Sequence, residues 1–77
     1  PTSMRILRAV TLHNQQGRSD KVYEVDLCEL DKSGLDRFVV NFRYGRRGGN
    51  LREGSKTPEA AERGDAEAIF DSASRLN

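Results

Sequence analysis

Two stretches of the chain alternate between apolar and polar residues, and this period of two predicts β-strands. In the first stretch, residues 21–30, the apolar positions of one parity are Tyr23, Val25 and Leu27. In the second stretch, residues 37–44, they are Phe38, Val40 and Phe42. Since successive side chains of a strand point to opposite faces, each strand has one apolar and one solvated face. The short connection between them contains Gly34 and predicts an antiparallel hairpin.

Two further strands are expected on either side of this hairpin. Residues 4–13 are apolar and β-branched, although their apolar positions fall on both parities. Residues 14–20 are dense in turn formers and predict a loop. Residues 50–57 predict a last strand beside the hairpin, which the glycine at position 54 weakens.

The final segment has the periodicity of a helix, with Asp65 as its expected N-cap. Its apolar positions at helical spacing are Ala66, Ile69, Phe70, Ala73 and Leu76. The preceding residues 57–64 also carry helix signals, with Thr57 as a cap and Pro58 in the first turn. Because so short a segment cannot sustain an isolated helix, we expect a loop or a single turn there.

Together these elements predict an α+β fold, an antiparallel β-sheet of about four strands with one C-terminal helix packed on one face. The expected core residues are Val25, Leu27, Phe38, Val40, Phe42, Ile69 and Phe70. The 77 residues are expected to form a single domain, residues 1–77. The first few residues, before Met4, are expected to be a remnant of the expression vector. Whether the chain is a fragment of a larger protein is left open.

The composition offers no disulfide or metal site that would stabilise so small a core. Cys28 is the only cysteine, so no internal disulfide can form, and no Cys/His set has the spacing of metal ligands. No run of residues approaches the roughly 18 apolar positions of a membrane span, and the first residues lack the layout of a signal peptide. We therefore expect a cytoplasmic protein without metal, cofactor or membrane partner.

No recognisable catalytic site is present in the sequence. His13 is the only histidine, and a partly exposed position at a strand end is its expected setting. Cys28 has the parity of neighbouring acids, so we expect it on the solvated face, where carboxylates raise the pKa of a thiol. The glycine-rich segment "YGRRGG" matches neither of the glycine motifs that hold nucleotide phosphates. The sequence therefore predicts a protein that is not an enzyme.

Charges are segregated along the chain, although the net charge is only +1. Residues 37–52 contain no acidic residue and five arginines, which are Arg37, Arg43, Arg46, Arg47 and Arg52. Acidic residues flank this window on both sides. Such a distribution predicts one basic patch on a nearly neutral domain.

Within this window, residues 42–50 form a corner with the sequence "FRYGRRGGN". Arginine binds phosphate through paired, charge-assisted hydrogen bonds, and an aromatic ring packs on sugars or bases. We expect a nucleic-acid-binding surface formed by Arg43, Tyr44, Gly45, Arg46 and Arg47, with Arg52 and Lys56 as supporting cations. Two alternatives stay open. The glycines merely turn the chain while Tyr44 completes the core face, or the corner docks on an acidic protein surface.

These segments resemble the WGR domain, a family named for a Trp-Gly-Arg motif. The resemblance covers residues 21–76 and rests on "SDKVYEVDL", "RFVVNFRYGRRG", a following Gly-Ser-Lys-Thr segment and the closing helix. Lys21-Val22-Tyr23 is similar to the family's Lys-Phe-Tyr, and Tyr44-Gly45-Arg46 is similar to Trp-Gly-Arg. WGR domains occur in DNA-damage-activated poly(ADP-ribose) polymerases, where they contact DNA near a break, and in bacterial proteins.

The resemblance implies a regulatory, non-catalytic module that binds DNA rather than RNA. It places Tyr44 where the family's tryptophan packs against a DNA terminus, and Arg46 at the motif arginine. The chain departs from the family by having tyrosine in place of tryptophan. It also has Asp20 where many members have asparagine, and an acid repels phosphate. The alternative function is docking to another protein or to another domain of a larger polypeptide.

Overall fold

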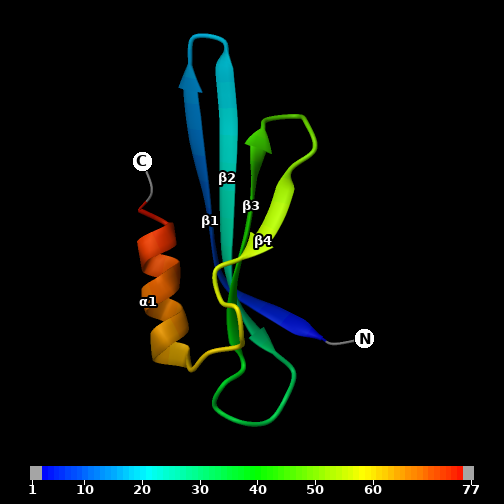
Figure 1. Cartoon of the computed structure of the whole chain (residues 1–77), viewed down its shortest axis with the longest axis vertical. Helices are drawn as coiled ribbons and strands as arrows, with labels where there is room; N and C mark the ends of the chain where they lie inside the picture. Colours follow the sequence, from blue (N-terminus) through cyan, green and yellow to red (C-terminus); the bar gives the residue numbers. More distant parts are fainter. Residues whose placement is uncertain (1–2, 76–77) are drawn as a thin grey trace.

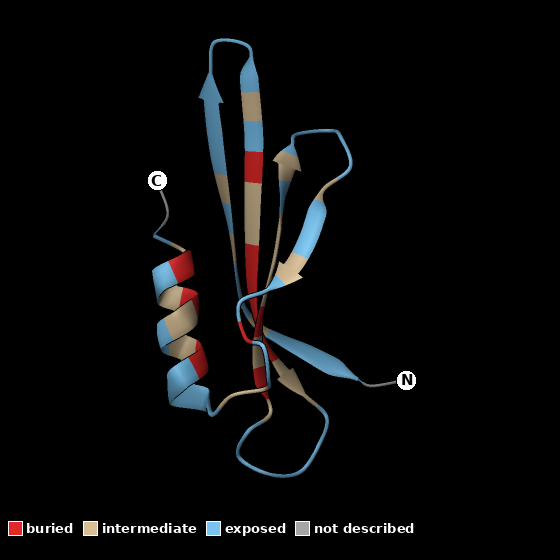
Figure 2. Cartoon of the chain, viewed as in Figure 1, coloured by how far each residue is buried: buried red, intermediate tan, exposed pale blue. Residues whose placement is uncertain are grey.

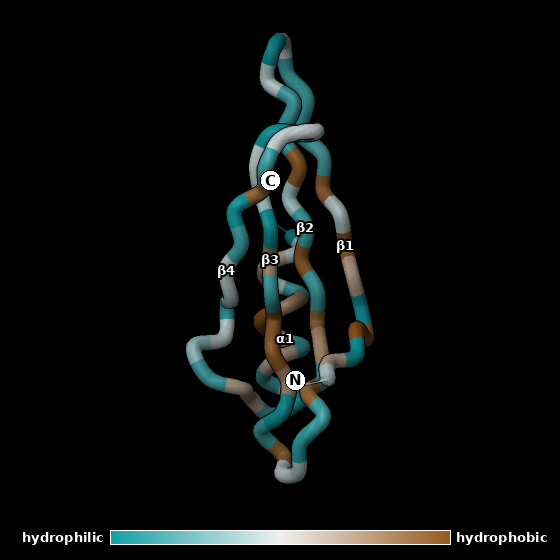
Figure 3. Tube along the Cα trace, turned by 90° about the vertical axis from the view of Figure 1, so that its right-hand side faces the viewer, coloured by the Kyte–Doolittle hydropathy of each residue, from teal (hydrophilic) through white to brown (hydrophobic). Residues whose placement is uncertain are grey.

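The computed structural model describes residues 3–75, which form a four-stranded sheet and one helix (Figure 1). The elements are β1 (Met4–Gln16), β2 (Ser19–Leu30), β3 (Phe38–Arg46), β4 (Arg52–Ser55) and α1 (Arg63–Ala73). The strands lie in the order β1-β2-β3-β4, and every neighbouring pair is antiparallel (Figure 3). The predicted α+β arrangement of an antiparallel sheet with a C-terminal helix is confirmed.

The β1–β2 hairpin is longer than the sequence predicts. Pairing continues to Gln16 and Ser19, so only Gly17 and Arg18 form the turn. Gly17 has a φ of +60°, and the first of two turn residues is where glycine is favoured in a type II′ hairpin turn. The predicted loop over residues 14–20 is therefore wrong, because a two-residue turn lets the polar residues around it join the strand ladder. The tip of this hairpin projects beyond β3 (Figure 1).

A β-bulge interrupts β1 and explains why its apolar residues fall on both parities. The register between β1 and β2 shifts between Ile6 and Arg8, so Leu7 is the extra residue. Leu7 packs against the core, whereas Ile6 is exposed on the other face. Beyond the bulge, the first residues of β1 bend away from α1 (Figure 1).

The core lies between α1 and the face of β2 and β3 that it covers (Figure 2). Its buried members are Val25, Leu27, Phe38, Val40, Ala66, Phe70 and Ala73. Of the predicted core, Phe42 and Ile69 are half-buried at its margin, and the other five residues are fully buried. The predicted Leu76 contact lies outside the described residues.

The connection from β4 to α1 has no helix, as expected, and it is fixed to the edge of β3. Phe38 and Ala61 exchange two backbone hydrogen bonds of 2.9 and 2.7 Å, and the buried Thr57 hydroxyl accepts one from Val40 N–H. The helix begins at Arg63, with Glu62 rather than Asp65 at the N-cap. The prediction for Asp65 is wrong because Gly64 is accommodated within the first turn, so the helix starts earlier.

Candidate functional site

The helix covers less than half of the sheet face on which it lies. The 11 residues of α1 measure about 16 Å, whereas the 12 residues of β2 extend about 40 Å. The rest of this face, toward the hairpin tip, has no element over it in the described chain (Figures 1 and 2). We call this part, which carries Lys21, Tyr23, Tyr44, Arg46 and Arg52, the open face.

Three aromatic side chains lie together where the open face meets the core. Directly opposed residues of antiparallel strands share a face, and Tyr23 opposes Tyr44 while Val25 opposes Phe42. The ring centroids of Tyr23, Phe42 and Tyr44 are 5.9, 5.9 and 6.5 Å apart, with planes within 8–27° of each other. Three nearly equal separations exclude a single column of stacked rings. The rings therefore form a patch, which we call the aromatic patch.

The aromatic patch is partly open to solvent. Tyr44 is 42% exposed, so it shares the core face but lies beyond the helix, and the interpretation of Tyr44 as a core residue is not supported. Phe42 leans over Gly54 of β4, where an added Cβ would lie 2.5 Å from the Phe42 Cζ atom. Glycine at position 54 thus leaves room for the Phe42 ring.

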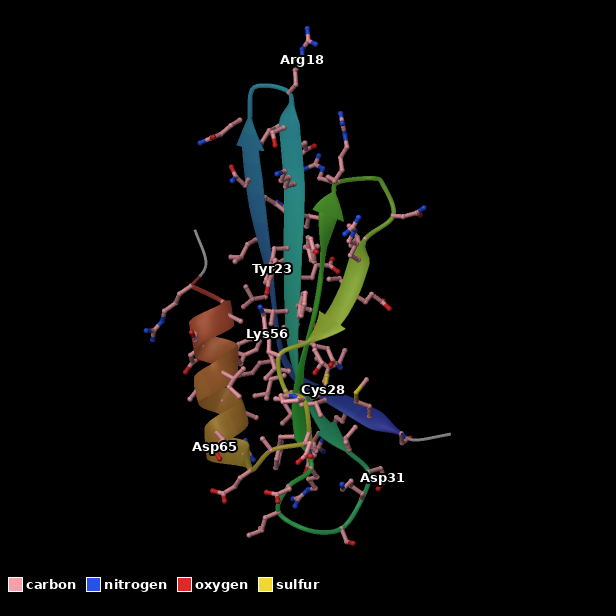
Figure 4. The ribbon with its side chains drawn as sticks, viewed as in Figure 1. Arg18, Tyr23, Cys28, Asp31, Lys56 and Asp65 are labelled. Carbon is pink, nitrogen blue, oxygen red and sulfur yellow. The ribbon has the colours of Figure 1, made fainter. Side chains whose placement is uncertain are left out.

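Four exposed cations surround the aromatic patch on the same side of the sheet. Lys21 opposes Arg46, and Arg52 opposes Tyr44, so all three side chains belong to the open face. The Lys56 Nζ atom lies 4.6 Å from the centroid of the Phe42 ring. The positions of Lys56 and Tyr23 are labelled in Figure 4. Among residues 3–75, none of these four cations forms an ion pair with a carboxylate. We call Lys21, Arg46, Arg52 and Lys56 the free cations.

Arg43 lies on the opposite face and is already paired. Its Nε atom donates to Glu24 at 2.8 Å, and its Nη2 atom donates to Asp26 at 2.9 Å. These hydrogen bonds raise the pKa of the Arg43 guanidinium, so its positive charge stays committed to the two carboxylates. The structure therefore separates Arg43 from the other predicted contacts, because side chains of odd and even positions in β3 leave on different faces.

At the glycine corner, Arg47 pairs with Asp20, and Gly45 allows close packing of the backbone. The sequence predicts both residues as direct contacts to nucleic acid. Arg47 donates its backbone N–H to the Asp20 carbonyl at 2.9 Å, and its side-chain Nε is 3.6 Å from the Asp20 carboxylate. Arg47 thus offsets the negative charge of Asp20. Gly45 has a φ of +157°, and an added Cβ would lie 3.2 Å from the Asn50 carbonyl oxygen. Close packing of the corner therefore requires Gly45.

A hollow of about 1070 Å³ runs from the aromatic patch toward the hairpin tip. Its walls include the amide side chains Asn14 and Gln16 and the patch residues Tyr23 and Tyr44. The hydroxyl oxygen of Tyr23 is enclosed and has no hydrogen-bond partner within the described chain. Five residues of this candidate site were not among the binding residues predicted from the sequence. They are Asn14, Gln16, Lys21, Tyr23 and Phe42. Strand parity could have found Tyr23 and Phe42, because both share the face of Tyr44.

Other reactive groups lie away from the open face. Cys28 is 1% exposed, so its expected place on a solvated face is wrong. Cys28 opposes Ile6 at the bend of β1, and Figure 4 shows it beside the first residues of that strand. Burial raises the pKa of the Cys28 thiol, and the Asp26 carboxylate raises it further. His13 is exposed.

Across residues 3–75, no three His, Cys, Asp or Glu side chains come together as a metal site would require. The same part of the chain has no helix that is both long and apolar enough to cross a membrane. Comparison with known proteins gives no matching family model, curated protein or solved structure. The resemblance to the WGR domain therefore stays a prediction.

Proposed function

We propose that this protein is a non-catalytic, WGR-like module that binds nucleic acid, DNA in preference to RNA, through its open face. The proposal rests on one observation above all. The free cations stand around the aromatic patch on one side of the sheet, whereas Arg43 and its acidic partners occupy the other side. A surface with unpaired positive charge around partly exposed rings suits a polyanion that also offers sugars and bases.

Arg46, Lys21, Arg52 and Lys56 would contact phosphates, and Tyr44 would contact a sugar or a base. Arg47 would serve mainly to neutralise Asp20, and Arg43 would take no part in binding. The family resemblance, and not the geometry, is the reason for preferring DNA. A regulatory role in the bacterial cytoplasm belongs to the same proposal.

The proposal is tested by fluorescence anisotropy with a 5′-phosphorylated DNA duplex at low and moderate salt. The double variant Arg46→Ala/Arg52→Ala removes two free cations and should weaken binding about tenfold, while flattening the slope of log K against log salt by about 1.8. The matched control Lys32→Ala/Arg63→Ala removes the same charge far from the open face. Equal losses in both double variants would contradict the site assignment.

A second candidate function is docking on an acidic protein surface, and the exposure of Tyr44 beside Arg46 favours it as well. Tyrosine and arginine are enriched in the cores of protein interfaces. Failure of the domain to bind any DNA saturably at low salt, whether duplex or single-stranded, would favour this alternative. Competition by heparin as effective as competition by DNA would point the same way.

A further inference from the structure

We infer that the ligand of the open face is an unpaired strand of nucleic acid whose bases stack on the aromatic patch. This inference rests on the proposed function and names its substrate class. A base inside a duplex is covered on both faces by its neighbours, so an aromatic side chain reaches a base face only in a single strand or at a duplex end. The patch offers such a stacking surface.

The orientation of the rings supports stacking. Because the planes of Tyr23, Phe42 and Tyr44 lie within 8–27° of each other, their faces point in a common direction. The Lys56 ammonium lies over the Phe42 ring, 4.6 Å from its centroid, which covers that ring with a cation. Tyr44, at 42% exposure, is then the ring that can take a base, with Tyr23 behind it in the hollow.

Polar groups in the hollow match the edges of unpaired bases. Asn14 opposes Lys21 in the β-ladder and therefore lies on the open face, and Gln16 has the same parity. Each side-chain amide offers both donors and an acceptor, and these are the groups that read Watson–Crick edges. The enclosed Tyr23 hydroxyl, which has no partner within residues 3–75, adds one more group that a base or a bound water can satisfy. Watson–Crick edges are free only in an unpaired strand.

The cations stand on both sides of the patch along the strand direction. Arg46 is two residues beyond Tyr44 in β3, so it lies about 6.8 Å further toward the hairpin tip. Toward the core, Lys56 lies over Phe42, whereas Arg52 lies beside the patch, opposite Tyr44 on the edge strand. A strand that crosses the patch therefore meets positive charge before and after the stacked bases.

The test compares three fluorescein-labelled probes of similar length, which are an oligo(dT) strand, a blunt duplex with 5′-phosphates, and a duplex closed at both ends by ethylene-glycol linkers that carry no bases. We expect the oligo(dT) strand to bind tightest and the closed duplex weakest. Tyr44→Leu, which keeps apolar bulk without a ring, should weaken oligo(dT) binding by about fivefold or more. Tyr44→Phe keeps the ring and should recover most of the affinity that Tyr44→Leu loses.

Intrinsic fluorescence gives a second readout, because the chain has two tyrosines and no tryptophan. Stacking should quench tyrosine emission when oligo(dT) is added, and Tyr44→Phe should lose most of this quenching. Thermal unfolding of each variant shows that the fold is kept.

The outcomes separate the inference from the proposed function. Equal binding of all three probes, with Tyr44→Leu unchanged and Arg46→Ala weakened, would overturn the inference and leave the function standing. Tightest binding of the blunt duplex would overturn it in favour of reading duplex ends. Absence of saturable binding to every probe would overturn both.

Discussion

Arg43 and Arg46 belong to the same strand, but the sheet directs them to opposite faces and gives them different roles. Arg43 pairs with Glu24 and with the nearly buried Asp26, which is 7% exposed, whereas Arg46 is exposed and makes no ion pair within the described chain. A charge is valuable for binding only if no partner already neutralises it.

The first prediction separates these two arginines. Arg43→Met should lower the free energy of unfolding by about 1–3 kcal/mol, because it leaves the Asp26 carboxylate buried without its partner. Affinity for nucleic acid, measured on the folded variant, should stay unchanged. The matched variant Arg46→Met should show the reverse pattern in urea unfolding and anisotropy. A folded Arg43→Met protein with clearly weaker binding would contradict the separation.

The second prediction concerns Gly54, which lies under the Phe42 ring. Gly54→Ala places a Cβ 2.5 Å from the Phe42 Cζ atom, so the ring must move. Overpacking of this kind should cost about 1–3 kcal/mol of unfolding free energy and shift the aromatic proton resonances of Tyr23 and Tyr44. Urea unfolding and NMR measure the two effects. Wild-type stability in this variant would show that the ring is not held there.

At the scale of the elements, the first turn of α1 lacks a side-chain cap and contains a glycine. Glu62 occupies the N-cap but makes no side-chain hydrogen bond to the helix, and Gly64 lies inside the helix with no atom near the position of an added Cβ. The third prediction is that Gly64→Ala raises the free energy of unfolding by about 0.5–1 kcal/mol, since alanine loses less backbone entropy. Nucleic-acid affinity should be unchanged, because Gly64 is far from the open face. A destabilised variant would contradict the assigned helix start.

Glu29 links three segments at the lower end of the sheet, and its ion pairs predict a dependence of stability on pH. It accepts hydrogen bonds from Arg5 of β1 at 2.6 Å and from Arg37, just before β3, at 2.7 Å. The bonds from Arg37 and then Arg5 hold the pKa of the Glu29 carboxyl below its ordinary value of 4.5. The folded state therefore binds its proton later than the unfolded state as the pH falls.

The fourth prediction follows from the lowered pKa of the Glu29 carboxyl in the folded state. The contribution of Glu29 to stability is complete above its ordinary pKa and is lost as the pH falls through the lower pKa of the folded state. Wild-type protein should therefore lose more stability between neutral and strongly acidic pH than Glu29→Gln does. Thermal unfolding across this pH range is the measurement. Parallel pH profiles for the two proteins would show that the pairs contribute nothing.

Local patterns predicted the central elements well, because α1 covers one face of β2 and β3 and so imposes a clear alternation on them. They failed where distant contacts decide the outcome. The two-residue turn at Gly17 extends a ladder through polar residues that resemble a loop. The bulge of β1 at Leu7 brings Ile6 across from Cys28. Cys28 is buried there, although the alternation of β2 predicts that it lies on the solvated face.

The placement of the candidate site residues could be predicted only in part for the same reason. The arginine-rich window found Arg46, Arg52 and Tyr44, and the structure places them on one face. Counting charges along the chain could not distinguish the free Arg46 from the paired Arg43 and Arg47. That distinction depends on strand register, which brings Glu24 opposite Arg43.

At the scale of the whole molecule, the shape explains why the open face is left uncovered. The molecule measures 47 × 26 × 19 Å, because the β1–β2 hairpin extends well beyond the helix (Figure 1). A longer helix would bury Tyr23 and Tyr44 in a larger core. The short helix instead leaves these rings and the free cations on a surface that a ligand can reach, while the paired charges on the other face stabilise the fold.

The most direct test of this account is an NMR titration of the ¹⁵N-labelled domain with oligo(dT) and with the closed duplex. The account predicts that the largest chemical-shift changes occur on the open face, at Lys21, Tyr23, Tyr44, Arg46 and Arg52. The side-chain Nε–H signal of Arg43, on the opposite face, should change little, whereas those of Arg46 and Arg52 should shift. Changes concentrated on that opposite face, or no changes with either probe, would contradict the claim that the open face binds nucleic acid.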